Sequence, residues 1–258
     1  MKTTAIIPAR YHSTRLPGKP LIEINGKPLI QYVYERVLTS SIKQVIVATD
    51  DERIAAAVKD FGGEAALTSP HHRSGTERVA EVARRIKSDI VVNVQGDEPL
   101  IQPEDIDKSI APFAHDPSIM VTTLIAPLLN GADLHNPHVV KVVVNHDGFA
   151  LYFSRSPIPY PRKALEKTGG EPLKEIELIK HLNKKELRDF WQHIGLYAFQ
   201  RDFLLKLTSF PPSALEQQEG LEQLRILEHG YKIKTVVCAS PSIGIDTPQD
   251  VEHFKSLL

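Results

Sequence analysis

The sequence predicts an α/β protein in which a doubly wound, mostly parallel sheet carries a smaller insertion. Short, nearly continuous runs of β-branched residues alternate with helical patterns over the first hundred residues, which is typical of a parallel sheet covered by helices on both faces. The pattern changes in the second half, which contains a hairpin-like segment and a charged segment. The length of 258 residues allows one large domain, or one domain with an insertion.

The first hundred residues supply strands and helices in alternation. Apolar runs predict three strands, at residues 4–8, 44–49 and 89–94. Apolar residues at helical spacing predict three helices, at residues 28–40, 50–61 and 76–87. Gly62 and Gly63 end the second helix. Sheets of this class bind ligands beyond the carboxyl ends of their strands, so we expect the loops that follow the three strands to converge.

The second half departs from this alternation. Runs at 139–145 and 150–154 predict a hairpin, and a proline-rich loop is expected to follow it. Residues 163–188 are rich in lysine and glutamate and are expected to form a solvated insertion that ends in a helix. The remaining pattern predicts a helix at 213–229 closed by Gly230, a strand at 231–239, and a terminal helix at 248–258 capped by Thr247.

The composition is that of an ordinary globular protein. Hydrophobic residues make up 41% and charged residues 24%, and the net charge of -1 gives no electrostatic surface for nucleic acid or membrane. The one cysteine, Cys238, lies in an apolar run and is expected to be a buried, inert thiol. No secretory signal or membrane span is recognised, so a cytoplasmic location is expected.

A polar loop after the first predicted strand has the composition expected of a triphosphate-binding loop. It contains two arginines, two hydroxyls, a glycine and a lysine. Backbone N–H groups can approach the phosphates there, while Arg15 and Lys19 neutralise them. Neither GxGxxG nor GxxxxGK[ST] is present, so the loop matches neither standard nucleotide-binding fingerprint.

Two aspartates are candidates for a magnesium site. Asp97 follows the strand at 89–94, where a simple turn residue is the alternative interpretation. Asp246 precedes a Thr-Pro pair that begins a helix, where a capping role is the alternative. Magnesium bound with nucleotide phosphates usually takes one or two protein carboxylates. If both aspartates reach one site, they can hold a metal ion against the triphosphate and the attacking oxygen.

Other polar residues have structural and functional interpretations that the sequence leaves open. Residues 71–78 lie at a helix entry, where Ser74 or Thr76 with Glu77 could form a capping arrangement and the polar side chains could also recognise a base. His193 precedes a strand-like segment and is either a satisfied structural residue or a ligand contact. Glu222 lies on an amphipathic helix and is either solvated or a ligand contact.

Taken together and in this order, these segments closely resemble the 3-deoxy-manno-octulosonate cytidylyltransferase (CMP-Kdo synthetase) family of Gram-negative bacteria. The resemblance is carried by IPAR at 7–10, STRLPGKP at 13–20, IVATD at 46–50, SGTER at 74–78, NVQGDEP at 93–99, ALYFSR at 150–155, HIGLY at 193–197, LEQLR at 221–225 and DTP at 246–248. Each motif is unspecific by itself, but the ordered set spans nearly the whole chain. Residues 161–188 have no match in detail.

The resemblance implies a magnesium-dependent homodimer that transfers CMP from CTP to 3-deoxy-D-manno-octulosonate and releases pyrophosphate, which activates the sugar for lipopolysaccharide synthesis. The implied catalytic residues are Lys19, Asp97 and Asp246, and the two aspartates would hold Mg²⁺. The implied CTP-binding residues are Pro8, Ala9, Arg10, Ser13, Thr14, Arg15, Lys19, Arg73, Ser74 and Gly75. The implied sugar-binding residues are Gln95, Arg155, His193, Tyr197, Glu222 and Gln223. Within one nucleotidylyltransferase domain, 1–130 and 231–258 would form the nucleotide-binding core, and about 131–230 would contribute the sugar pocket and dimer face.

Two other functions compete with this one. A nucleotidylyltransferase that acts on sialic acid or a sugar 1-phosphate would share much of the pattern, although the motifs at His193 and Glu222 favour the octulosonate. A non-catalytic regulator that binds a sugar nucleotide could share the fold, since fold alone does not establish activity. A mere binder does not need a neutralised α-phosphate, so the presence of Lys19 together with both aspartates argues against it.

Overall fold

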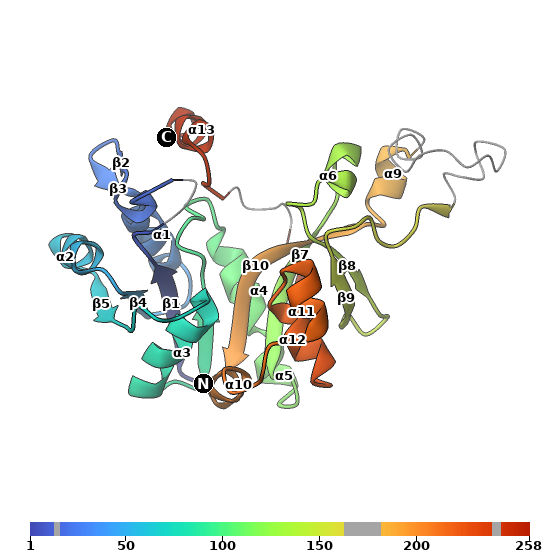
Figure 1. The fold of residues 1–258 in the computed structure, drawn as a ribbon, viewed down its shortest axis with the longest axis horizontal. Coiled ribbons are helices and arrows are strands. Elements are labelled where there is room, and N and C mark those ends of the chain that lie inside the picture. Colours follow the sequence, from blue (N-terminus) through green and yellow to red (C-terminus); the bar gives the residue numbers. More distant parts are fainter. Residues whose placement is uncertain (13–15, 163–181, 239–243) are drawn as a thin grey trace. The chain divides into compact units, whose positions relative to one another are not determined.

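The computed structural model describes residues 1–12, 16–162, 182–238 and 244–258, and the chain divides into two compact units (Figure 1). Unit 1 comprises Met1–Thr122, Gly195–Ser209 and Ser242–Leu258. Unit 2 comprises Thr123–Ile194 and Phe210–Pro241. These bounds differ from the expected division, because Gly195–Ser209 belongs to unit 1 and residues 231–241 belong to unit 2.

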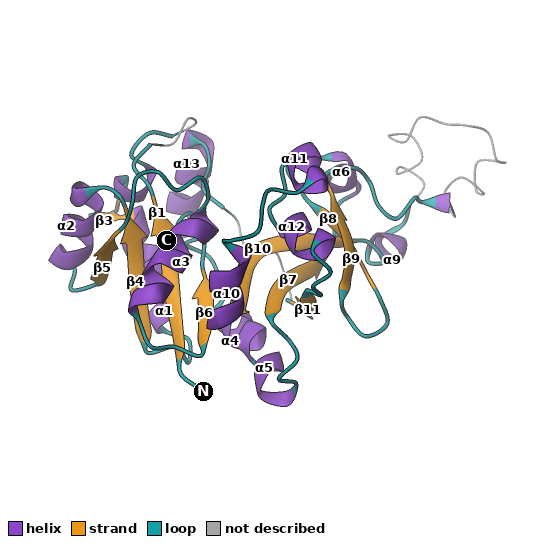
Figure 2. Cartoon of the chain, turned by 60° about the horizontal axis from the view of Figure 1, so that its bottom comes forward, coloured by secondary structure: helices purple, strands orange, loops and turns teal. Residues whose placement is uncertain are grey.

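Unit 1 is built on a mostly parallel sheet. Its parallel strands are β1 (Thr3–Ala9), β4 (Gln44–Thr49), β5 (Glu64–Leu67) and β6 (Ile90–Asn93), and β10 (Trp191–Gln200) pairs with β6 in the antiparallel direction through its last residues. The strand order is β10-β6-β1-β4-β5, and Figure 2 shows these strands side by side. The expected parallel sheet and its first three strands are confirmed. A separate short hairpin joins β2 (Glu23–Ile24) to β3 (Lys27–Pro28).

The helices of unit 1 cover both faces of this sheet. They are η1 (Lys19–Leu21), α1 (Leu29–Leu38), α2 (Glu52–Asp60), α3 (Gly75–Arg85), α4 (Pro103–Ile110), α5 (Pro112–His115), α10 (Arg201–Leu207) and α13 (Pro248–Ser256). The chain moves along the sheet in opposite directions from β1 to β4 and from β5 to β6. Right-handed crossovers therefore place α1 and α3 on opposite faces. The four helices predicted for unit 1 are confirmed, whereas β5, α4, α5 and α10 had not been predicted.

Unit 2 contains the second part of the fold. Its strands are β7 (Val121–Pro127), β8 (Lys141–Val144), β9 (Ala150–Ser154), the first residues of β10, and β11 (Lys234–Val237), and its helices are α6 (Gly131–His135), α9 (Lys184–Leu187), α11 (Ala214–Glu219) and α12 (Gln223–Glu228). The predicted hairpin is confirmed, since β8 and β9 pair in the antiparallel direction. Most of the expected charged insertion lies outside the described residues, and α9 is its terminal helix.

The prediction of one helix over 213–229 is wrong, because the chain forms two helices there. Gly220 adopts a left-handed conformation, with φ of 62°, at the end of α11. That conformation ends a helix and favours glycine. The second helix, α12, turns back onto the first, and the Arg225 guanidinium pairs with the Glu216 carboxylate at 2.7 Å. Helix-forming residues flank Gly220 on both sides, so the segment was interpreted as one helix, although residues 216–220 include no apolar side chain.

Cys238 is buried, as expected, and its thiol contacts the Ile125 carbonyl oxygen at 3.4 Å. This contact holds the end of β11 beside β7 within unit 2, which agrees with a structural role for the thiol. Among the residues that the structure describes, no helix has both the length and the apolar character needed to cross a membrane.

Lys141, the first residue of β8, is fully buried. Its Nζ donates hydrogen bonds to the carbonyl oxygens of Asn136, at 2.9 Å, and Val139, at 2.6 Å. Burial and the nearby charge of Arg155 lower the pKa of Lys141 to about 8, although Glu219 and Asp133 act in the opposite direction. Burial therefore raises the free energy of the charged form of Lys141 in the folded protein.

We predict that Lys141 makes the free energy of unfolding depend on pH. Between pH 8 and 10.5 the unfolded chain keeps a proton that the folded protein has released, so stability rises with pH in this window. One such proton adds at most about 1.4 kcal/mol per pH unit. Urea unfolding of the wild type and Lys141→Met from pH 7 to 10 measures the effect. The wild type should gain stability relative to the variant, and a constant difference between them would contradict the prediction.

Candidate active site

A cavity of about 280 Å³ lies in unit 1 beyond the carboxyl ends of β1 and β6. The residues with an implied role that line it are Pro8, Ala9, Arg10, Lys19, Arg73, Ser74, Gly75, Gln95, Asp97 and Asp246. The structure thus brings together residues from the ends of β1 and β6, the start of η1, the entry to α3 and the segment before α13. Ser13, Thr14 and Arg15 lie outside the described residues.

Lys19 contacts both candidate metal-binding carboxylates. Its Nζ lies 2.6 Å from Asp97 Oδ2 and 3.1 Å from Asp246 Oδ1, and it donates a third hydrogen bond to the Ile245 carbonyl oxygen at 2.9 Å. The lysine side chain is only 13% exposed, compared with 33% for Asp97 and 40% for Asp246, so the carboxylates remain accessible from the cavity. The two aspartates therefore reach one place, which was the condition for a shared metal site.

Main-chain contacts hold the two aspartates in position. The Ile245 N–H donates to the Asp97 carbonyl oxygen at 2.8 Å. A Cβ atom on Gly96 would lie 2.8 Å from the Pro8 carbonyl oxygen, so the loop after β6 approaches the end of β1 more closely than any side chain permits. Thr247 caps α13 as predicted, because its side chain accepts the Asp250 N–H, and Asp246, which contacts Lys19, lines the cavity.

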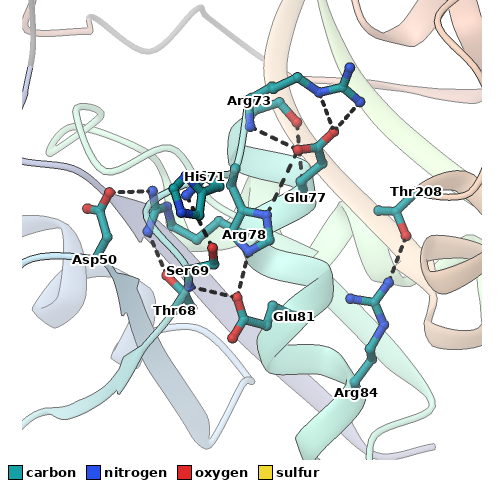
Figure 3. Close-up of polar contacts among 12 residues, drawn as sticks. Asp50, Thr68, Ser69, His71, Arg73, Glu77, Arg78, Glu81, Arg84 and Thr208 are labelled. Carbon is teal, nitrogen blue, oxygen red and sulfur yellow. Dashed lines mark hydrogen bonds and ion pairs between the residues drawn. The ribbon is translucent and has the colours of Figure 1, made fainter.

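The segment before α3 places Arg73 beside the cavity (Figure 3). The Ser74 hydroxyl accepts the Glu77 N–H at 3.2 Å, which confirms the predicted cap. The Glu77 carboxylate accepts the Arg73 N–H at 2.9 Å and pairs with the Arg73 guanidinium at 3.0 Å. Burial raises the pKa of Glu77, but hydrogen bonds from Arg73 and the charge of Arg73 outweigh it and hold the pKa below its usual value.

Two polar residues beside this segment line the cavity without having been predicted to do so. Arg78 is buried on α3 and donates to the Asp50 carboxylate at 2.9 Å and to the Thr68 hydroxyl at 2.5 Å (Figure 3). His72 Nε2 lies 2.6 Å from a Glu81 oxygen. The signal for Arg78 was present in the sequence, since an arginine within the apolar stripe of a helix must find buried partners.

The implied sugar-binding residues fall in both units. Gln95 and Tyr197 belong to unit 1, where the Gln95 amide donates to the Gly195 carbonyl oxygen at 3.0 Å. Arg155, His193, Glu222 and Gln223 belong to unit 2. Glu222 is the N-terminal cap residue of α12, directly before Gln223. Gln223 is buried, and its Nε2 has no hydrogen-bond partner within the described part of the chain.

Arg155 follows β9 and is held by main-chain carbonyl groups of unit 2. Its Nε donates to Glu219 at 2.7 Å, Nη1 to Pro137 at 2.7 Å, and Nη2 to Gly220 at 3.3 Å. A guanidinium has five N–H donors, so these contacts fix its orientation and, within the described part of the chain, use only one N–H of each terminal nitrogen. Arg155 thereby also joins the end of β9 to the segments around Pro137 and Gly220 within unit 2.

His193 is held in unit 2 in its neutral form. Its Nε2 lies 2.9 Å from the Thr123 hydroxyl, and its ring packs edge-on against Phe153 with ring centroids 5.1 Å apart. Burial lowers the pKa of His193 to about 3. A neutral imidazole can exchange a hydrogen bond with a hydroxyl but does not supply a positive charge.

Known proteins resemble the chain over its full length. The family model for cytidylyltransferases matches residues 4–233. The chain is 52% identical to the 3-deoxy-manno-octulosonate cytidylyltransferase of Geotalea uraniireducens (strain Rf4), with coverage of 100% of this chain and 99% of the relative. It is 49% identical to the protein of that name from Geobacter sulfurreducens, with coverage of 100% of both.

Solved structures agree with these sequence matches. A structure of CMP:2-keto-3-deoxy-manno-octonic acid synthetase complexed with CTP superposes with a TM-score of 0.87 at 43% identity, and the match covers 100% of this chain and 98% of that one. A cytidylyltransferase from Leptospira borgpetersenii superposes with a TM-score of 0.62 at 20% identity, covers 99% of this chain and 86% of its own, and shows the fold alone.

Proposed function

The chain belongs to the 3-deoxy-manno-octulosonate cytidylyltransferase family, and we propose that it transfers CMP from CTP to 3-deoxy-D-manno-octulosonate with release of pyrophosphate. The similarity extends over 99% and 100% of the length of these two relatives. The observation that carries the proposal is the Lys19 ammonium between two carboxylates in a cavity of unit 1. This arrangement suits displacement at a phosphorus atom.

CTP would bind in this cavity with its phosphates near the cations that line it. Arg10 and Lys19 would neutralise the triphosphate. Arg15 would contribute in the same way, but it lies outside the described residues, so its role stays a prediction. Pro8, Ala9, Arg73, Ser74 and Gly75 would surround the nucleoside. Gly75 allows close approach there, since a Cβ atom at this position would already lie 3.3 Å from Pro8 Cγ. The same roles for Ser13 and Thr14 stay predictions.

Asp97 and Asp246 would hold the Mg²⁺ ion. No group of three or more His, Cys, Asp or Glu side chains in the described part of the chain could hold a metal ion without help. Two carboxylates nevertheless suit magnesium that arrives with nucleotide phosphates, because phosphate oxygens and water complete its octahedron. When bound, the ion would supply positive charge to the α-phosphate and the attacking oxygen.

The chain's own groups would act mainly by positioning and charge neutralisation. In-line displacement joins the anomeric hydroxyl oxygen of the sugar to the α-phosphorus and breaks the bond to pyrophosphate. Negative charge on the α-phosphoryl oxygens grows in the transition state. Lys19 already lies between the carboxylates, and its ammonium would interact more strongly with the transition state than with bound CTP.

The sugar acid would be bound by Gln95, Arg155, His193, Tyr197, Glu222 and Gln223. The oriented guanidinium of Arg155 suits a carboxylate, which accepts two parallel hydrogen bonds. The neutral His193 and the Gln223 amide nitrogen, which has no partner among the described residues, suit the hydroxyl groups of a sugar. These features support a polar, acidic sugar as acceptor.

The proposal includes a homodimer, activation of the sugar for lipopolysaccharide synthesis, and a cytoplasmic location. The β8–β9 hairpin would contribute the dimer face, and its Leu151 side chain is 60% exposed. Analytical ultracentrifugation of the wild type and Leu151→Asp would test the dimer. The lipopolysaccharide role and the location remain predictions.

Pyrophosphate release with CTP and a panel of acceptors tests the central proposal. Release with 3-deoxy-D-manno-octulosonate and Mg²⁺ is expected, with much less release from sialic acid or a sugar 1-phosphate. Release only with sialic acid would favour the related cytidylyltransferase, and binding of CTP without release from any acceptor would favour the non-catalytic regulator.

We predict that Asp97→Asn lowers turnover by at least about a hundredfold and leaves the fold intact, because electrostatic stabilisation of the transition state is lost. Pyrophosphate release at saturating Mg²⁺ and a circular dichroism melting curve measure the two effects. Turnover close to that of the wild type would contradict the assignment of Asp97.

We predict that Lys19→Ala lowers kcat more than it weakens CTP binding, because the ammonium interacts most strongly with the charge of the transition state. Steady-state kinetics and calorimetry with CTP separate the two quantities. A raised KM for CTP with an unchanged kcat would instead identify Lys19 as a ground-state contact.

We predict that Arg155→Ala weakens binding of the sugar acid by roughly 2–5 kcal/mol, as expected when a desolvated charge pair is lost. CTP binding should change little, because the proposed CTP-binding residues all lie in unit 1. Calorimetry with each ligand alone provides the measurement. Equal weakening of both ligands, with a lower melting temperature, would assign Arg155 a purely structural role.

A further inference from the structure

Arg53, on α2, has an exposed side chain whose orientation is fixed by its own helix. The side chain is 58% exposed, yet its Nε lies 3.0 Å from Asp51 Oδ1 and its Nη2 lies 2.6 Å from Asp51 Oδ2. Asp51 is itself held as the N-terminal cap of α2, because Oδ1 accepts the Arg53 N–H at 2.9 Å. The two-pronged contact sets the plane of the guanidinium.

This guanidinium covers the ring of Tyr11. Arg53 Cζ lies 3.5 Å from the ring centroid, which is the geometry of a close cation–π contact. Tyr11 comes directly after Arg10, which lines the cavity, whereas Arg53 is not among the described residues that line it. The contact therefore acts on the segment that leaves β1 and not on the cavity itself.

Tyr11 in turn contacts the residue before Lys19. The Tyr11 carbonyl oxygen accepts the Gly18 N–H at 2.9 Å. Gly18 has φ of 68°, and a Cβ atom there would lie 3.2 Å from the Tyr11 ring, so both the backbone and the packing require glycine. Gly18 is the N-terminal cap residue of η1, and Lys19 is its first residue.

We propose that Arg53 is a positioning residue for CTP: it holds Tyr11 against Gly18 and so fixes Lys19 between Asp97 and Asp246. The sequence of contacts runs from α2 through one aromatic ring and one main-chain hydrogen bond to the ammonium. The inference rests on the proposed function, because that function makes CTP the ligand of Lys19. A lysine cannot replace Arg53, since an ammonium lacks the planar fork that engages Asp51 while it stacks on a ring.

The test compares Arg53→Ala with Lys59→Ala, which removes another exposed cation of α2. Arg53→Ala should lower kcat/KM for CTP by roughly two- to fivefold, the range expected for loss of an exposed cation–π contact. The KM for the sugar acid and the melting temperature should match those of Lys59→Ala. Arg53→Lys should resemble Arg53→Ala. Activity of Arg53→Ala equal to that of Lys59→Ala would overturn the proposal.

A comparison of CTP with CMP binding distinguishes a positioning role of Arg53 from a general structural role. In calorimetry, Arg53→Ala should weaken CTP more than CMP, because CMP has one phosphate where CTP has three. Equal weakening of CTP and CMP would overturn the proposal. The effect should also depend on the ring: Tyr11→Leu should give the same defect, and the double variant should be no worse than either single variant. Additive losses would show that the two residues act separately and would likewise overturn it.

The same measurements distinguish failure of this inference from failure of the proposed function. If the wild type binds CTP but releases no pyrophosphate with 3-deoxy-D-manno-octulosonate, the proposed function fails, and the comparison of CTP with CMP still decides the role of Arg53. If the wild type is active and Arg53→Ala matches Lys59→Ala in every measurement, only the role of Arg53 fails.

Discussion

The ammonium of Lys19 between two carboxylates is the interaction on which the site of unit 1 depends. It draws together the start of η1, the loop after β6 and the segment before α13, which are far apart in the sequence. The carboxylates are one-third or more exposed, and ion pairs of that kind contribute little to stability. We therefore interpret these ion pairs as charged groups held in place for a ligand, and not as a main source of stability for the fold.

Backbone geometry makes this concentration of charge possible. The loop that carries Asp97 passes so close to the Pro8 carbonyl group that a side chain at position 96 would clash with it. Only glycine therefore fits at this position. The Ile245–Asp97 main-chain hydrogen bond then sets the register between that loop and the chain before α13. These main-chain contacts hold Lys19 and the two aspartates in fixed positions. Electrostatic catalysis requires charged groups that are already in place before the reaction.

Unit 2 differs from unit 1 in that it holds its polar groups in buried or half-buried positions. Arg155 is oriented by three carbonyl groups, and Lys141 is bound by two more from the neighbouring segment. His193 is kept neutral by burial, while the Gln223 amide is buried without a partner among the described residues. Unsatisfied buried amides are costly, so the Gln223 amide nitrogen is suited to a polar ligand.

The sequence by itself determined the parallel sheet, the main helices of unit 1 and the β8–β9 hairpin, because periodicity and turn chemistry are local. Most of the residues that line the cavity of unit 1 had been implied by the resemblance to the family and not by these local patterns. It missed β5, whose four residues are only partly buried, and the break at Gly220, which helix-forming residues flank on both sides. The partners of Arg78, which are Asp50 and Thr68, and the contact of Arg53 with Tyr11 were decided only by the tertiary structure. The reason is physical: spacing along the chain specifies which face a side chain occupies, but the partner that satisfies its charge comes from a segment that only folding brings near.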